Sequence, residues 1–171
     1  MGPNRMPSFL SSRLLFLAVF LGCTGMMAFG FYLQYVDGLE PCPLCMSQRV
    51  FIVAVGMCGL LAALHNPANT GIRVYGVLSL LFAIIGGSIS SRHIWLQSLP
   101  PDQAPACGPS VEYILDAFPL KDAITIMLSG DGNCAEVSWT FLTLTIPQWT
   151  LVAFAGLAAI ALINIVRPVK H

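Results

Sequence analysis

The sequence predicts an all-α membrane protein, a bundle of four transmembrane helices with a short amphipathic helix in its long outer loop. Composition is the first reason. Of the 171 residues, 56% are hydrophobic and only 9% are charged, whereas an ordinary soluble domain has about 25% charged residues. A water-soluble chain of this length could not enclose so much apolar surface. The net charge of zero argues against nucleic-acid binding, which calls for a basic surface.

Four apolar segments are the second reason, because a helix needs about 20 residues to cross the hydrocarbon core of a bilayer. The segments of that length are residues 14–36, 44–64, 74–91 and 149–166. The first is too long for the core of a signal peptide, which has about 7–15 residues. The third is rich in glycine and serine, which suit close helix contacts. The fourth opens on Trp149, a residue type typical of the membrane interface.

The positions of the basic residues predict the orientation of the bundle. Five of the eight flank the spans on one side, namely Arg5, Arg13, Arg73, Arg167 and Lys170. The positive-inside rule therefore places both termini in the cytoplasm and the two other loops, residues 37–43 and 92–148, outside. Arg49 and Arg92 lie near the outer ends of spans, where long basic side chains can also snorkel to the interface.

The outer loop over residues 92–148 has two parts. Its prolines predict an extended first part, since proline disfavours helix; they are Pro100, Pro101, Pro105 and Pro109. Apolar residues then recur at helical spacing, namely Leu120, Ile124, Met127 and Leu128. This pattern predicts a short amphipathic helix on the membrane surface, and a helix packed on protein is the alternative. The segment 129–133 ends this helix and carries Cys134.

A Cys-x-x-Cys pair, Cys42 and Cys45, stands where the first outer loop becomes the second span. Pro43 suits the first turn of a helix, so both sulfurs should lie at a helix N-terminus, where the macrodipole favours a thiolate. Arg49 follows Cys45 by four residues and should add a positive charge on the same helix face. This arrangement predicts a dithiol that exchanges electrons.

The six cysteines divide by position. Cys23 and Cys58 lie inside apolar spans, where a single cysteine is usually a small hydrophobic residue. The other four lie on the outer side, in an oxidising compartment, and allow three pairings. A redox pair Cys42–Cys45 leaves Cys107 with Cys134, a pair that could also be a structural staple. A zinc site of four thiolates is a further alternative, although the second pair lacks close spacing.

Two such pairs on one face suggest a relay. Thiol–disulfide exchange needs a thiolate, an attackable sulfur and access. A pair in the long loop could meet a soluble partner, while the pair at the membrane surface could meet an acceptor dissolved in the membrane. Quinones are the abundant two-electron acceptors there. The sequence thus permits a dithiol-to-quinone electron transfer.

The chain resembles the disulfide bond formation protein B (DsbB) family of quinone-dependent thiol oxidases over nearly its whole length. The resemblance is carried by the segments 41–45, 92–97 and 132–136, together with Arg49 and Trp149. It implies a protein of the bacterial inner membrane with periplasmic redox loops. Such a protein reoxidises a DsbA-like periplasmic dithiol oxidase and passes the electrons to ubiquinone or menaquinone, without a metal.

The same resemblance implies a role for each site residue. Cys107 would form the mixed disulfide with the partner, and Cys134 would then attack Cys42. The remaining thiol, Cys45, would be a thiolate in contact with the quinone, and the residues that bind the quinone would be Cys45, Arg49 and His93. On chemistry alone, His93 could equally be an interfacial polar residue.

Two other readings compete with the oxidase. A membrane scaffold would use both outer disulfides as structural bonds, which resist reduction where catalytic ones are readily reduced. A quinone reductase similar to the vitamin K epoxide reductase family would also carry a Cys-x-x-Cys in a four-helix bundle. In that family the dithiol lies late in the bundle, whereas Cys42 and Cys45 open the second span.

Overall fold

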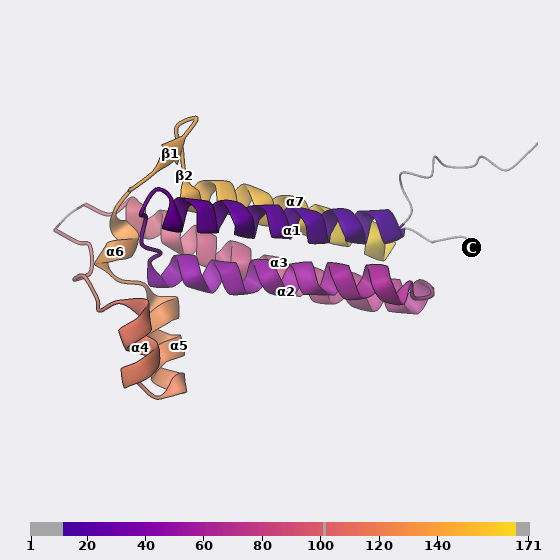
Figure 1. The fold of residues 1–171 in the computed structure, drawn as a ribbon, viewed down its shortest axis with the longest axis horizontal. Coiled ribbons are helices and arrows are strands. Elements are labelled where there is room, and N and C mark those ends of the chain that lie inside the picture. Colours follow the sequence, from indigo (N-terminus) through magenta and orange to yellow (C-terminus); the bar gives the residue numbers. More distant parts are fainter. Residues whose placement is uncertain (1–11, 101, 167–171) are drawn as a thin grey trace, which may run out of the picture.

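The computed structural model describes residues 12–100 and 102–166, and its four long helices form a bundle (Figure 1). These helices are α1 (Ser12–Tyr35), α2 (Pro43–His65), α3 (Asn69–Gln97) and α7 (Ile146–Val166). Each is long and apolar enough to cross a membrane. The predicted fold class, a helical bundle with four membrane spans, is confirmed.

The helix that contains the predicted third span extends beyond it at both ends. The prediction covers residues 74–91, but α3 runs from Asn69 to Gln97. The prediction followed the apolar residues alone and therefore stopped at Arg73 and Arg92. An arginine can nevertheless belong to a membrane helix, because its long apolar stem lies along the helix while its charged end reaches the interface. Arg92 and His93 are therefore helical and not part of the outer loop.

The centre of the bundle is closely packed. α2 packs on both α1 and α3, and α3 packs along α7. The largest buried cluster joins all four helices and consists of Val19, Cys23, Ile52, Val55, Ala83, Phe154 and Leu157. Gly86 of α3 lies directly against the ring of Phe154, so a side chain at that position would collide with it. Small residues thus bring α3 and α7 close together, as the composition of the third span predicts.

The long outer loop contains short elements. They are α4 (Val111–Ala117), α5 (Leu120–Ser129), α6 (Gly132–Ala135) and the antiparallel strands β1 (Thr140–Phe141) and β2 (Leu144–Thr145). The predicted helix over 120–128 is present as α5, whereas α4, α6 and the strands were not predicted. In Figure 1, α4 and α5 form a hairpin that projects sideways at one end of the bundle.

One side of α5 packs on the bundle and the other is exposed. Ala123 is buried, and the Ser47 hydroxyl of α2 donates a hydrogen bond to the Met127 carbonyl at 3.5 Å. Arg92 holds the end of α5, since its guanidinium donates twice to the Ser129 carbonyl, at 3.0 and 2.8 Å. The exposed apolar residues of α5 are Leu120, Ile124 and Leu128. Its position on a membrane surface remains a prediction.

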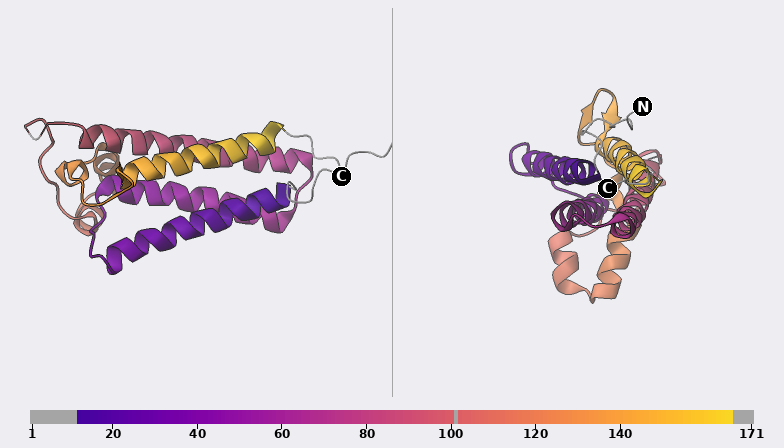
Figure 2. Two further views of the ribbon diagram at one scale, coloured as in Figure 1. Left: turned by 90° about the horizontal axis from the view of Figure 1, so that it is seen from above. Right: turned by 90° about the vertical axis from the view of Figure 1, so that its right-hand side faces the viewer.

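The start of α1 and the end of α7 lie together at the bundle end opposite α4, α5 and α6 (Figure 2). At that end the Arg13 guanidinium donates a hydrogen bond to the Ala63 carbonyl at 3.1 Å and thereby joins α1 to α2. Arg5, Arg167 and Lys170, on which the predicted orientation also rests, lie outside the described residues.

Candidate active site

The start of α2 sets the two thiols of the Cys-x-x-Cys pair. Pro43 is the first residue of the helix and Cys42 is its N-cap, so Cys45 lies in the first turn. The two sulfurs are 3.3 Å apart, and both are free thiols in this structure. Their position at a helix N-terminus agrees with the sequence prediction, and there the helix dipole favours a thiolate over a thiol.

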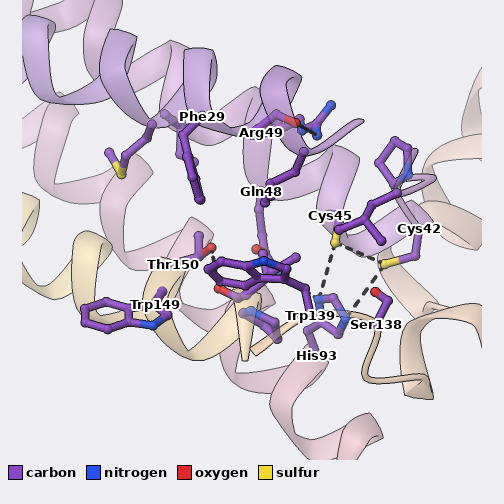
Figure 3. Close-up of a pocket in the computed structure, with 18 of the residues that line it drawn as sticks. Phe29, Cys42, Cys45, Gln48, Arg49, His93, Ser138, Trp139, Trp149 and Thr150 are labelled. Atoms are coloured by element: carbon purple, nitrogen blue, oxygen red, sulfur yellow. Dashed lines mark hydrogen bonds between the residues drawn. The ribbon is translucent and has the colours of Figure 1, made fainter. Parts of the chain in front are cut away.

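His93 of α3 lies beside both thiols (Figure 3). Its Nε2 atom is 3.8 Å from the Cys42 sulfur, and its Nδ1 atom is 4.0 Å from the Cys45 sulfur. The ring is only 2% exposed. A buried imidazole in contact with a dithiol is more than an interfacial polar residue, so its surroundings favour the role that the resemblance implies.

Gln48 is a residue that the sequence analysis missed. Its side-chain nitrogen lies 3.2 Å from His93 Nδ1, and its side chain is 2% exposed. With the amide as donor, Nδ1 accepts the hydrogen bond and the ring proton sits on Nε2, which faces Cys42. One sequence signal was available: Gln48 follows Cys45 by three residues, so the two side chains lie on the same side of the helix.

Arg49 links α2 to α1. Its guanidinium donates hydrogen bonds to the Gln34 side-chain oxygen and, at 3.0 Å, to the Gly30 carbonyl. It also lies over the Phe31 ring, 5.4 Å from the ring centre. The arginine is therefore held in one position by α1. It lines the same cavity as Cys45.

Cys134 of α6 lies against the Cys-x-x-Cys pair. Its side chain is fully buried, with a relative exposure of 0%, among Leu44, Leu96 and Cys42. A hydrogen bond with Cys42, followed by burial, raises the pKa of the Cys134 thiol well above its usual range. Three of the four sulfurs of the predicted relay thus converge at one place.

Cys107 differs from the other three because its side chain is exposed. Its backbone nevertheless lies beside the segment that carries Cys134. The Gly132 N–H donates to the Ala106 carbonyl at 3.0 Å, and the Asn133 side chain donates to the Gly108 carbonyl at 3.3 Å. The predicted Cys107–Cys134 bond is not formed in this structure, where both thiols are free. The pairing remains a prediction.

A cavity of about 620 Å³ opens beside the thiols. Helices α1, α2, α3 and α7 line it together with the segment after α6 (Figure 3). One part of the wall carries the polar groups of Cys45, Gln48, Arg49 and His93. Other walls are aromatic, and Trp139 packs edge-on against Phe29 with ring centres 5.8 Å apart. Such a cavity suits a planar, mostly apolar molecule with a few polar atoms, and a quinone fits this description.

The same polar wall could hold a metal ion. One ligand atom each from Cys42, Cys45 and His93 can be chosen so that all three lie within 4.8 Å of one another. Cys107, which the four-thiolate alternative requires, is not in this group.

The chain is similar to known proteins over most of its length. The family model described as "Disulfide bond formation protein DsbB" matches residues 12–164. A disulfide bond formation protein B of Hahella chejuensis is 55% identical over 155 residues, which cover 91% of this chain and 94% of that protein. One of Saccharophagus degradans is 52% identical, covering 92% and 93%. The disulfide bond formation protein B 1 of Pseudomonas aeruginosa is 43% identical, covering 92% and 96%.

Proposed function

Because this multi-pass membrane protein belongs to the disulfide bond formation protein B family, we propose that it is a protein-dithiol:quinone oxidoreductase of the bacterial inner membrane. Its partner is a DsbA-like periplasmic oxidase, and its acceptor is ubiquinone or menaquinone. Both termini are cytoplasmic and the redox loops are periplasmic. The observation that carries the proposal is the convergence of Cys42, Cys45 and His93 at the wall of one cavity, with Cys134 in the buried cluster that contains Cys42.

Electrons enter at Cys107, the exposed thiol of the four. In the oxidised protein a thiolate of the partner attacks the Cys107 sulfur of a Cys107–Cys134 disulfide. A bond forms between the partner and Cys107, and the bond to Cys134 breaks, leaving the electron pair on Cys134. The second thiol of the partner then displaces Cys107, so that the partner leaves with a disulfide.

Electrons next pass to the Cys-x-x-Cys pair. Cys134 and Cys42 belong to one buried cluster, so the freed Cys134 sulfur is placed to attack Cys42 of a Cys42–Cys45 disulfide. The Cys42–Cys134 bond forms, and the electron pair of the broken bond remains on Cys45. The Cys107 thiolate then attacks Cys134, which re-forms the Cys107–Cys134 bond and releases Cys42, so that both thiols of the Cys-x-x-Cys pair are reduced. Cys45 is suited to carry its electron pair, because it lies in the first turn of α2 and faces the cavity.

The cavity residues would hold the quinone, which when bound supplies an acceptor for two electrons and two protons. Arg49 would place its fixed charge at the polar wall, with α1 keeping the guanidinium in position. His93, with a ring proton on Nε2, would serve as a hydrogen-bond donor beside the sulfurs. The aromatic walls would exclude water from the ring.

The function is tested by mixing the purified, oxidised protein in detergent with quinone and a reduced thioredoxin-like periplasmic protein. Quinone absorbance and free partner thiols are followed together. We expect quinone to be reduced as the thiols disappear, one quinone for each dithiol. If the partner keeps its free thiols and the quinone is not reduced, the result would favour the membrane scaffold, in which both outer disulfides are structural.

Replacing Arg49 should separate the two halves of the reaction. In Arg49→Ala the quinone half-reaction should slow by about 10–100-fold, because charge-assisted hydrogen bonds contribute about 1.5–3 kcal/mol. The rate of Arg49→Lys should lie between those of wild type and Arg49→Ala, since lysine keeps the charge but loses the forked contact with Gln34 and Gly30. Stopped-flow measurement of each half-reaction checks this.

The matched control for Arg49 is Arg92→Ala, which removes an arginine that binds the Ser129 carbonyl and does not line the cavity. It should leave the quinone half-reaction at the wild-type rate. Equal losses in both half-reactions of Arg49→Ala would contradict the division of labour between the two disulfide pairs.

A further inference from the structure

We propose that the reduced protein binds a soft divalent cation of the zinc class through Cys42, Cys45 and His93. The bound cation would make the protein unable to reduce quinone. The binding site stands on its own geometry, whereas the inhibition rests on the proposed function.

Two of the three separations between ligand atoms are already close to those that a zinc ion requires. Zinc binds sulfur at about 2.3 Å and nitrogen at about 2.0–2.1 Å, so tetrahedral ligand atoms lie roughly 3.4–3.8 Å apart. The two sulfurs are 3.3 Å apart, and His93 Nε2 is 3.8 Å from the Cys42 sulfur. The Cys45 sulfur is 4.0 Å from Nδ1 of His93, so side chains would have to shift to bring this sulfur to an ion bound at Nε2.

The chemistry of the ligands selects the class of cation. Two thiols and an imidazole favour zinc and similar soft ions over magnesium or calcium, which prefer oxygen ligands. A cation binds at Nε2 only when the ring proton is on Nδ1, so Gln48, 3.2 Å from Nδ1, would turn its amide and accept that proton through its side-chain oxygen. Outer hydrogen bonds of this kind fix the imidazole ligands of metal sites.

The fourth position is open to water or to a small shift of Cys134. That thiol lies in the same buried cluster as Cys42 but does not belong to the group of three ligand atoms. Three protein ligands with one open position are a common zinc arrangement.

The oxidation state of the protein controls this site. Only the reduced form offers two thiols, and each loses its proton as the cation binds. A Cys42–Cys45 disulfide has no thiolate to offer. A cation on the Cys45 sulfur occupies the atom that faces the cavity and prevents disulfide formation. Free zinc would therefore trap the reduced protein until a chelator removes the ion.

The binding test uses fully reduced protein in detergent, titrated with Zn²⁺ against a chromophoric chelator. Cd²⁺ serves as a second probe, because cadmium–thiolate bonds absorb in the ultraviolet. We expect one tightly bound ion per chain, absent after oxidation. Cys45→Ser and His93→Ala should each weaken binding by at least about tenfold. Cys107→Ser should bind as wild type does, because Cys107 is outside the group.

Inhibition is measured on the same samples. Zn²⁺ should stop quinone reduction by wild type, and a chelator should restore it. Tight binding that is equal in wild type, Cys45→Ser and His93→Ala would overturn the site, as would a loss in Cys107→Ser matching that in Cys45→Ser. Quinone reduction by a protein that binds no Zn²⁺ would overturn the site and leave the proposed function intact. Zn²⁺ binding without any quinone reduction would support the site and overturn only the function.

Discussion

Cys42→Ser is expected to stop turnover after at most one partner dithiol has been oxidised per protein. The Cys42 sulfur is 3.3 Å from the Cys45 sulfur and lies in one buried cluster with Cys134, so it joins the two predicted pairs. Without it neither Cys42–Cys45 nor Cys42–Cys134 can form, and a Cys107–Cys134 disulfide can be used only once. The steady-state rate should fall at least about 10³-fold, as when one member of a catalytic unit is removed.

The measurement follows partner thiols and quinone absorbance through the first turnover and then at steady state. Partner thiols should fall by one dithiol per protein and then stay constant, while quinone absorbance does not change. Cys58→Ser is the matched control, because it makes the same substitution at a buried cysteine inside a membrane span, and it should turn over normally. Continued quinone reduction by Cys42→Ser would mean that electrons bypass this sulfur.

Much of the bundle was predictable because its signals are local. An apolar run of sufficient length defines a span whatever its neighbours are, and Pro43 after Cys42 marks the start of a helix. The same local reasoning predicted too short a segment for α3, because Arg92 interrupts the apolar sequence. Its guanidinium binds the Ser129 carbonyl, a partner far away in the sequence that no local pattern reveals.

The site was only partly predictable for the same physical reason. The Cys-x-x-Cys spacing alone predicts that Cys42 and Cys45 lie close together. The contact of His93 with these thiols depends on the rotation of α3 against α2, a matter of tertiary packing. Gln48 carries no motif, and only its contact with His93 distinguishes it. The burial of Cys134 depends on how the outer loop folds back over the bundle.

Cys107→Ser should produce the complementary defect to Cys42→Ser. Cys107 is the exposed thiol among the four, whereas Cys134 is completely buried, so a protein partner can attack only the former. Partner oxidation should fall at least about 10³-fold. Quinone reduction driven by a small dithiol such as dithiothreitol should persist, because Cys45 is partly accessible and faces the cavity.

Comparing the two reductants distinguishes an entry point from a structural residue. A variant that merely disturbs the loop would weaken both reactions, since the backbone around Ala106 and Gly108 holds the segment that carries Cys134. Loss of the reaction with dithiothreitol to the same degree would therefore place Cys107 in the structure of the site and not at its entrance. Unimpaired partner oxidation would show that the partner reaches another sulfur, and the order of the relay would have to be reversed.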